Sequence, residues 1–269
     1  MWPWVASAGF ALLIVWSYQG TQVDLAGLLG GEGRHQIVTY VAKLFPPDLS
    51  AKTLRDAALG AVETFAISFV GSVLAVVIAL PLAVLTTRSL LYRGILYEGR
   101  RLRPVSKGSR IGVYVIAKAV LNVLRTIPEI VWALIFVLLV GLGPFPGVLA
   151  LGFHTGGVLG KLFGEVLDDV NPRPIETLHS AGAGRLAILF YGILPQAAPQ
   201  CLSYALYRWE VNIRAAAVMG FVGAGGLGQR IYIAISLFLD NQLLTLILAI
   251  YVMVTVVDVL SAYLRRRFL

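Results

Sequence analysis

Residues 61–86 read AVETFAISFVGSVLAVVIALPLAVLT, with Glu63 as the single charged side chain. The hydrocarbon core of a bilayer needs about 20 mostly apolar residues per helix, and this stretch exceeds that length. Because lipid offers the backbone no hydrogen-bond partners, a segment of this kind spans as a helix. The stretch therefore predicts a membrane protein built from helices.

Comparable apolar runs recur along the chain. They predict about six transmembrane helices, over residues 2–19, 61–86, 111–140, 146–163, 186–207 and 241–263. A Gly-rich apolar stretch, 215–239, is left open as a span or a re-entrant segment. The first run lacks a basic start and a small-residue cleavage site, so it is expected to be a retained helix.

The composition agrees with this class. The chain is 58% hydrophobic and 13% charged, with a mean hydropathy of +0.81, far from the composition of soluble domains. We expect an all-α polytopic membrane protein with one domain, 1–269, and a core over 60–263.

Basic residues in the short connections predict the orientation, because they are retained on the cytoplasmic side. The connection 87–110 holds seven basic residues against one acid, Glu98. The seven are Arg88, Arg93, Arg100, Arg101, Arg103, Lys107 and Arg110. This connection, the loop 164–185 and Arg265–Arg267 are then expected to face the cytoplasm of a bacterial inner membrane, provided that 215–239 does not cross completely.

Several function classes are disfavoured. A net charge of +8 is placed by topology rather than on one soluble face, so no nucleic-acid partner is expected. One cysteine and three histidines offer no metal-ligand spacing. Neither a nucleophile with an adjacent base nor a GxxxxGK[ST] loop is found, so we expect no catalysis, no metal and no cofactor bound by this chain.

The loop 164–185 carries the most informative motif. From Asn171 it reads NPRPIETLHSAGAGR, and Pro195 follows Gly182 after thirteen residues. A proline suits the start of a helix and Gly182 permits a sharp exit, while Glu176 favours the positive end of the helix dipole.

This spacing resembles the EAA loop of ABC importer permeases, although Thr177 and Leu178 replace two alanines of that pattern. The resemblance implies a short helix that couples the permease to a cytoplasmic ATPase. It assigns the coupling contact to Glu176, Thr177, Ala181 and Gly182.

Three further stretches resemble the phosphonate and phosphite branch of this family. They are Arg125–Ala133, Gly141–Lys161 and Tyr207–Arg214. The resemblance covers about residues 60–260 and implies a type I ABC importer permease fold. It also implies a phosphonate, phosphite or phosphate cargo. Methionine and other amino-acid importers share the loop and the Gly-rich end, so permeation of an amino acid is the alternative within the family.

The third predicted helix carries a polar stripe. Lys118, Asn122, Arg125 and Glu129 are spaced four, three and four apart, which places them on one helical face. Ionisable groups inside a membrane normally face a partner or an aqueous path, so the stripe is a candidate translocation path. Equally, Arg125 and Glu129 can pair with each other while Lys118 reaches the cytoplasmic interface. Pro128 is expected to kink the helix and turn Glu129 aside.

A Gly-rich segment matches a dinucleotide-binding pattern by spacing alone. Gly223, Gly225, Gly226 and Gly228 satisfy most of G-x-G-x-x-G, but no strand and helix of a soluble βαβ unit flank them. They are expected to allow close helix packing or a bent backbone used in gating.

The resemblance implies the partners as well. They are a second copy of this chain, two copies of a cytoplasmic ATPase that uses ATP and Mg, and a periplasmic or lipid-anchored substrate-binding protein. The rival hypothesis is a stand-alone proton- or sodium-coupled transporter that uses Glu63, Asp258 or Lys118. Such carriers usually show two corresponding halves, and none are found here.

Overall fold

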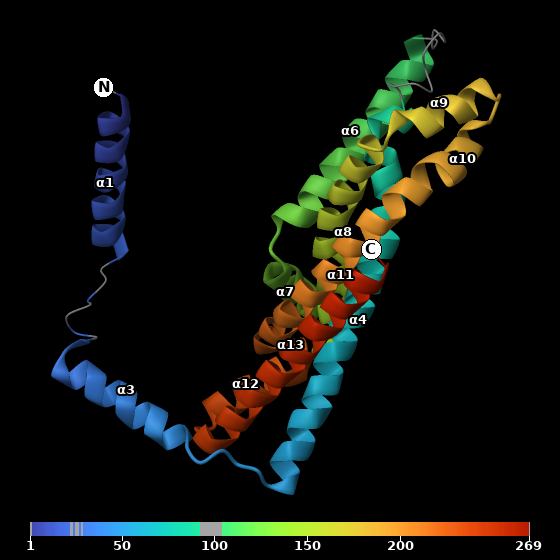
Figure 1. The fold of residues 1–269 in the computed structure, drawn as a ribbon. Helices are drawn as coiled ribbons and strands as arrows, with labels where there is room; N and C mark the ends of the chain where they lie inside the picture. Colours follow the sequence, from blue (N-terminus) through green and yellow to red (C-terminus); the bar gives the residue numbers. More distant parts are fainter. Residues whose placement is uncertain (1, 22–23, 25–26, 28, 92–103, 269) are drawn as a thin grey trace. The chain divides into compact units, whose positions relative to one another are not determined.

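The computed structural model describes residues 2–21, 24, 27, 29–91 and 104–268. Within these residues every regular element is helical (Figure 1). The predicted all-α class is therefore confirmed. The chain divides into two compact units, Met1–Pro47 and Asp48–Leu269, and the predicted core 60–263 lies inside the second.

The first unit contains α1, Trp2–Thr21, and α3, Gly31–Leu44. The first predicted helix corresponds to α1. The amphipathic helix α3 lies in a segment that hydropathy alone does not single out, because its apolar residues are interrupted by Arg34, His35 and Lys43. Neither helix has a buried residue within its unit.

The spine of the second unit is the packing of α4, Ala51–Thr86, against α8, Pro144–Asp168. Glycines recur every four residues on one face of α8, at Gly152, Gly156, Gly160 and Gly164. Because glycine has no side chain, Leu74 and Ile78 of α4 lie directly against the first two. Small buried residues of α4, including Ala75, Ala79 and Ala83, complete the contact. Close backbone approach therefore holds this pair together.

The helix predicted over 111–140 is wrong as a single span. It is divided into α6, Pro104–Thr126, and α7, Glu129–Val140, which meet at 91°. Pro128 lacks the N–H that a continuing helix needs, so the helix breaks where a kink was expected. Carbonyl oxygens freed by the break find other partners: Trp132 Nε1 donates to Leu124, and His154 Nδ1 lies 2.9 Å from the oxygen of Ile127.

The chain after α8 runs through short elements before it returns. These are α9 Pro172–Ser180, α10 Arg185–Ala187, a π-helical stretch Ile188–Ile193, α11 Leu194–Met219, the 3₁₀ turn η3 Gly220–Val222, α12 Gly226–Ser236 and α13 Asp240–Phe268. The open question over 215–239 now has an answer. With 11 residues at about 1.5 Å each, α12 is too short to cross a bilayer, and it continues α11 with a 41° bend.

The two ends of the second unit differ in character. The short helices α9 and α10 lie at one end together with the start of α6, while α12 and the start of α13 lie at the other (Figure 1). The four-residue helix α5, Arg88–Leu91, follows α4 at the α9 end. Four of the basic residues on which the orientation depends, Arg93, Arg100, Arg101 and Arg103, lie outside the described residues, as does Glu98.

By length and hydropathy, α4 and α13 are candidate spans among the described residues, and each bent pair, α6 with α7 and α11 with α12, can form one more. That gives two to four candidate spans. The helices α1 and α8 are long enough but fall outside this set. Each of the six predicted apolar runs nevertheless falls on a helix or helix pair.

Candidate functional site

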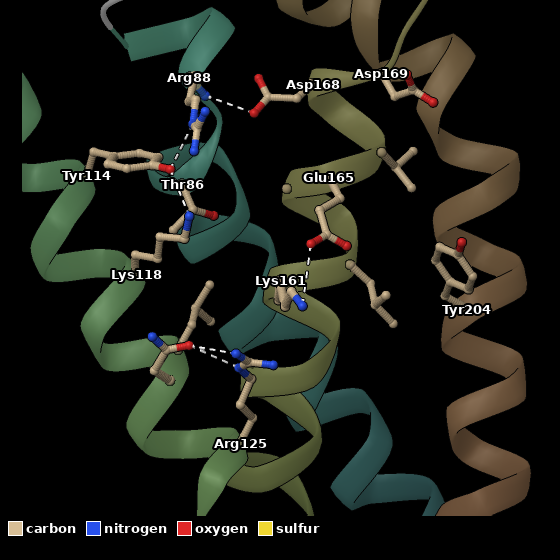
Figure 2. A pocket seen from close by; sticks show the side chains of 15 residues that line it. Thr86, Arg88, Tyr114, Lys118, Arg125, Lys161, Glu165, Asp168, Asp169 and Tyr204 are labelled. Atoms are coloured by element: carbon tan, nitrogen blue, oxygen red, sulfur yellow. Dashed lines mark hydrogen bonds and ion pairs between the residues drawn. The ribbon is translucent and has the colours of Figure 1, made fainter. Parts of the chain in front are cut away.

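A polar cavity of about 580 Å³ opens at the α9 end of the second unit. Its wall is formed by α4, α5, α6, α8 and α11 (Figure 2). The lining side chains that carry charge are Arg88, Lys118, Arg125, Lys161, Glu165, Asp168 and Asp169. Four positive and three negative groups therefore share one cavity in a chain that is mostly apolar.

Three members of the predicted stripe line this cavity together: Lys118, Asn122 and Arg125. Lys118 Nζ donates to the hydroxyl of Tyr114 at 3.0 Å. Arg125 donates from Nε and Nη2 to Asn122 Oδ1, at 3.1 and 2.8 Å. Both cations thus have neutral partners, and neither forms an ion pair with another described residue. Their positive charge stays available to a ligand.

The remaining charges of the cavity are compensated locally. Lys161 Nζ lies 3.5 Å from Glu165 Oε1, one turn along α8. The carboxylate of Asp168 accepts the backbone N–H groups of Arg88 and Ser89, which fixes the start of α5 to the end of α8. Arg88 Nε in turn donates to the Tyr114 hydroxyl at 2.9 Å. An anion entering the cavity therefore meets its uncompensated charge on α6.

Glu129 does not line the cavity. The bend at Pro128 moves it onto the first turn of α7, where its Oε2 lies 3.5 Å from Nε2 of His154. The predicted ion pair between Arg125 and Glu129 does not form in this structure, because the bend separates the two faces that a straight helix would have aligned. Proline chemistry, rather than helical spacing, decides the position of Glu129.

The coupling-loop residues lie on and just after α9. Ile175 is buried and Leu178 half-buried in the same apolar cluster as Leu167, whereas Glu176 and Thr177 are exposed. The helix begins two residues before Pro174, after the Asn171 cap, so Glu176 lies in the second turn and not at the positive end of the dipole. One face of α9 packs on the unit and the other faces outward.

A Schellman motif ends α9. Gly182 has φ +81°, its N–H donates to His179 O, and the N–H of Ala183 donates to Leu178 O. Ala181 precedes this glycine and is exposed, as is Gly182 itself. The sharp exit expected at Gly182 is present in the structure. The part of these residues in ATPase coupling stays a prediction.

The Gly-rich segment forms the turn between α11 and α12. Gly223, Gly225 and Gly226 have φ values of +90°, +80° and +73°, which side-chain-bearing residues rarely adopt. A Cβ on Gly228 would collide with the carbonyl oxygen of Ala217. The turn is anchored on α4, because Thr64 Oγ1 accepts the N–H of Leu227 at 2.8 Å. These glycines serve close packing and lie outside the cavity.

The acids considered for ion coupling are paired with arginines. Glu63 Oε2 lies 2.9 Å from Arg230 Nη1, and Asp258 accepts two hydrogen bonds from Arg214 Nη2 at 2.9 and 2.8 Å. The expected pair of Glu210 with Arg214 is present at 3.3 Å, and Arg265 also donates to Glu210. These ion pairs join α11 and α12 to their neighbours.

Sequence reasoning missed Arg88, Tyr114, Lys161, Glu165 and Tyr204 as cavity residues. One signal was present. Polar residues of α8 recur at 154, 161, 165 and 168, which is the periodicity of a single helical face. Tyr204 and Arg88 gave no such signal, because each stands alone on its own element.

Comparisons with known proteins identify the family. The model for the binding-protein-dependent transport system inner membrane component matches residues 110–269. The phosphite transport system permease protein PtxC of Stutzerimonas stutzeri is 36% identical over 260 residues, 97% of this chain and 86% of that protein. The putative phosphite transport system permease protein HtxC of the same organism is 35% identical over 235 residues, 87% of this chain and 77% of its own.

The fold is shared with a solved transporter. An inward-facing structure of the MetNI methionine ABC transporter superposes with a TM-score of 0.66 at 22% identity, covering 82% of this chain and 100% of that one. At that identity the likeness shows a fold of the ABC importer permease type. By the family match and these relatives, the chain belongs to the inner membrane components of binding-protein-dependent transport systems.

Proposed function

We propose that this permease subunit carries a phosphorus oxyanion, phosphonate, phosphite or phosphate, across the inner membrane. The observation that carries the proposal is the pair of uncompensated cations, Lys118 and Arg125, in a cavity open at the α9 end. Oxyanions of phosphorus take charge-assisted hydrogen bonds from arginine and lysine, and arginine binds them in a two-pronged geometry.

The names of the relatives agree with this cargo. Two proteins named for phosphite transport cover 97% and 87% of the chain. A methionine import permease of Bacillus subtilis matches over 48% of it. The fuller coverage favours a phosphorus oxyanion over an amino acid.

Energy is proposed to come from a separate ATPase that binds ATP and Mg and docks on the outward face of α9. This face presents Glu176 and Thr177, while Ile175 fixes the helix to the apolar cluster beneath it. A helix anchored in this way transmits a push or pull from a docked partner to α8 and α11. The complete transporter would contain two ATPase copies, a second copy of this chain and an external substrate-binding protein.

The proton- or sodium-coupled alternative gains no support from the acids it requires. Glu63 is held by Arg230 and Asp258 by Arg214, so neither carboxylate is free for an ion. Lys118 faces the cavity with a phenol as its partner, which suits anion binding equally well.

Competition tests the cargo. Cells that express this chain with its ATPase and binding protein are given radiolabelled methylphosphonate, with unlabelled phosphite, phosphate, sulfate or methionine in excess. Suppression of uptake by phosphite or phosphate, but not by methionine, is the expected result. Suppression by methionine alone would replace the proposed cargo with an amino acid.

A further inference from the structure

The polar faces that form the cavity continue past its inner end. On α8, His154 lies seven residues before Lys161, two turns away on the same face. On α11, Arg208 follows the cavity residue Tyr204 by one turn. Both faces therefore lead from the cavity toward the bend at Pro128, where Glu129 begins α7.

Arg208 is the unusual residue of this region. It is half-buried, its Nε is shielded from solvent, and that Nε has no hydrogen-bond partner within the described chain. Nor does Arg208 form an ion pair with any described residue. Glu129 is the carboxylate whose charge acts on it. A guanidinium held inside a membrane domain without a direct partner is costly, which points to a ligand that is bound for part of a cycle.

Glu129 has a second neighbour. His154 Nδ1 contacts the oxygen of Ile127, so that nitrogen carries the proton and Nε2 faces Glu129 at 3.5 Å. The carboxylate thus lies between a histidine on α8 and the field of an arginine on α11. A carboxylate presents two oxygens to a guanidinium, as a phosphonate or phosphite does.

We propose that Arg208 is a direct ligand of the transported oxyanion and that Glu129 holds the place of that anion when no cargo is bound. The inference rests on the proposed cargo and deepens it by naming a binding residue beyond the cavity. An oxyanion moving inward along Lys118 and Arg125 competes with Glu129 for Arg208. Removal of the Glu129 charge strengthens binding, and removal of the Arg208 donors abolishes it.

Binding to the purified permease–ATPase complex, without binding protein, tests this directly. Sodium methylphosphonate is titrated and the shift in thermal unfolding midpoint is recorded, with sodium chloride at equal ionic strength as reference. We expect Glu129→Gln to lower the half-saturating concentration about tenfold and Arg208→Gln to raise it about tenfold or more. Arg208→Lys should lie between wild type and Arg208→Gln, because lysine keeps the charge but not the fork.

A matched control and a double variant separate binding from structure. Glu63→Gln removes an acid that pairs with an arginine at the opposite end, and it should bind methylphosphonate as wild type does. In Glu129→Gln/Arg208→Gln the gain from the first change should disappear, since Glu129 acts through Arg208. Retained ATPase activity shows that each variant is assembled.

The outcomes divide cleanly. A gain that persists in the double variant, or a gain reproduced by His154→Gln with Arg208 intact, would mean that Glu129 only shapes the bend, and the inference falls. Wild-type binding by Arg208→Gln overturns it as well. If the wild-type transporter fails to take up methylphosphonate under ATP, the proposed cargo itself is wrong, whatever the variants do.

Discussion

Arg125 directs two N–H groups at a single oxygen of Asn122, at 3.1 and 2.8 Å, one turn earlier on the same helix. The amide holds the guanidinium in place without neutralising it. Lys118, a further turn along, is held in the same manner by the hydroxyl of Tyr114. A helix that orients its cations with neutral groups keeps them able to bind an anion and to release it.

Arg125→Gln should therefore reduce transport more than the loss of a compensated cation. We expect the uptake rate of methylphosphonate to fall about tenfold, the usual consequence of losing a charge-assisted hydrogen bond. Lys161→Gln is the comparison, because Lys161 already pairs with Glu165 in the same cavity. Its uptake rate should change about threefold at most. Equal losses in the two variants would argue against the distinction drawn between the two cations.

Gly182→Ala should destabilise the helix end after α9. Its φ of +81° is unfavourable for alanine by about 1 kcal/mol. Gly184→Ala is the matched control, since no neighbouring atom would meet its Cβ and its φ is not positive. The free energy of unfolding, measured by titration in mixed micelles, should fall for the first variant and stay within about 0.5 kcal/mol for the second. Equal values for both would show that the Schellman geometry is not retained in the protein.

Asn212 joins three helices in the core. Its Nδ2 donates to Ser72 Oγ on α4 at 2.9 Å, and its Oδ1 accepts from Thr155 Oγ1 on α8 at 2.8 Å. Asn212→Ala leaves both hydroxyls without this buried partner and should cost about 1 to 2 kcal/mol of unfolding free energy.

Ser236→Ala provides the reference for Asn212, because that hydroxyl is exposed and bonds within its own helix. A double-mutant cycle with Thr155→Val measures the coupling. Additive effects of the two changes would show that the network contributes nothing beyond its separate members.

Local patterns predicted much of the fold. Apolar runs located the helices, the spacing of Lys118, Asn122 and Arg125 placed them on the face that lines the cavity, and Pro128 marked the break. Helix ends were less well predicted. Ala51 begins α4 ten residues before the apolar run, because hydropathy detects lipid contact whereas the Ser50 cap decides where the helix starts.

Pairs between distant segments could not be predicted. Arg230 meets Glu63 across 167 residues of chain, and Asn212 meets Ser72 across 140. Such contacts depend on which helix faces meet, and this depends in turn on the glycine face of α8 against the small residues of α4. A single sequence shows the faces, but not their partners.

The energy source is the most direct test of the central claim, that this chain forms an ATP-driven path for a phosphorus oxyanion. Proteoliposomes that hold the chain with its ATPase are supplied with loaded binding protein, and uptake of radiolabelled methylphosphonate is followed with ATP or with an imposed proton gradient. The account predicts uptake that requires ATP and is lost in Glu176→Lys. Uptake driven by the gradient without any ATPase would contradict it.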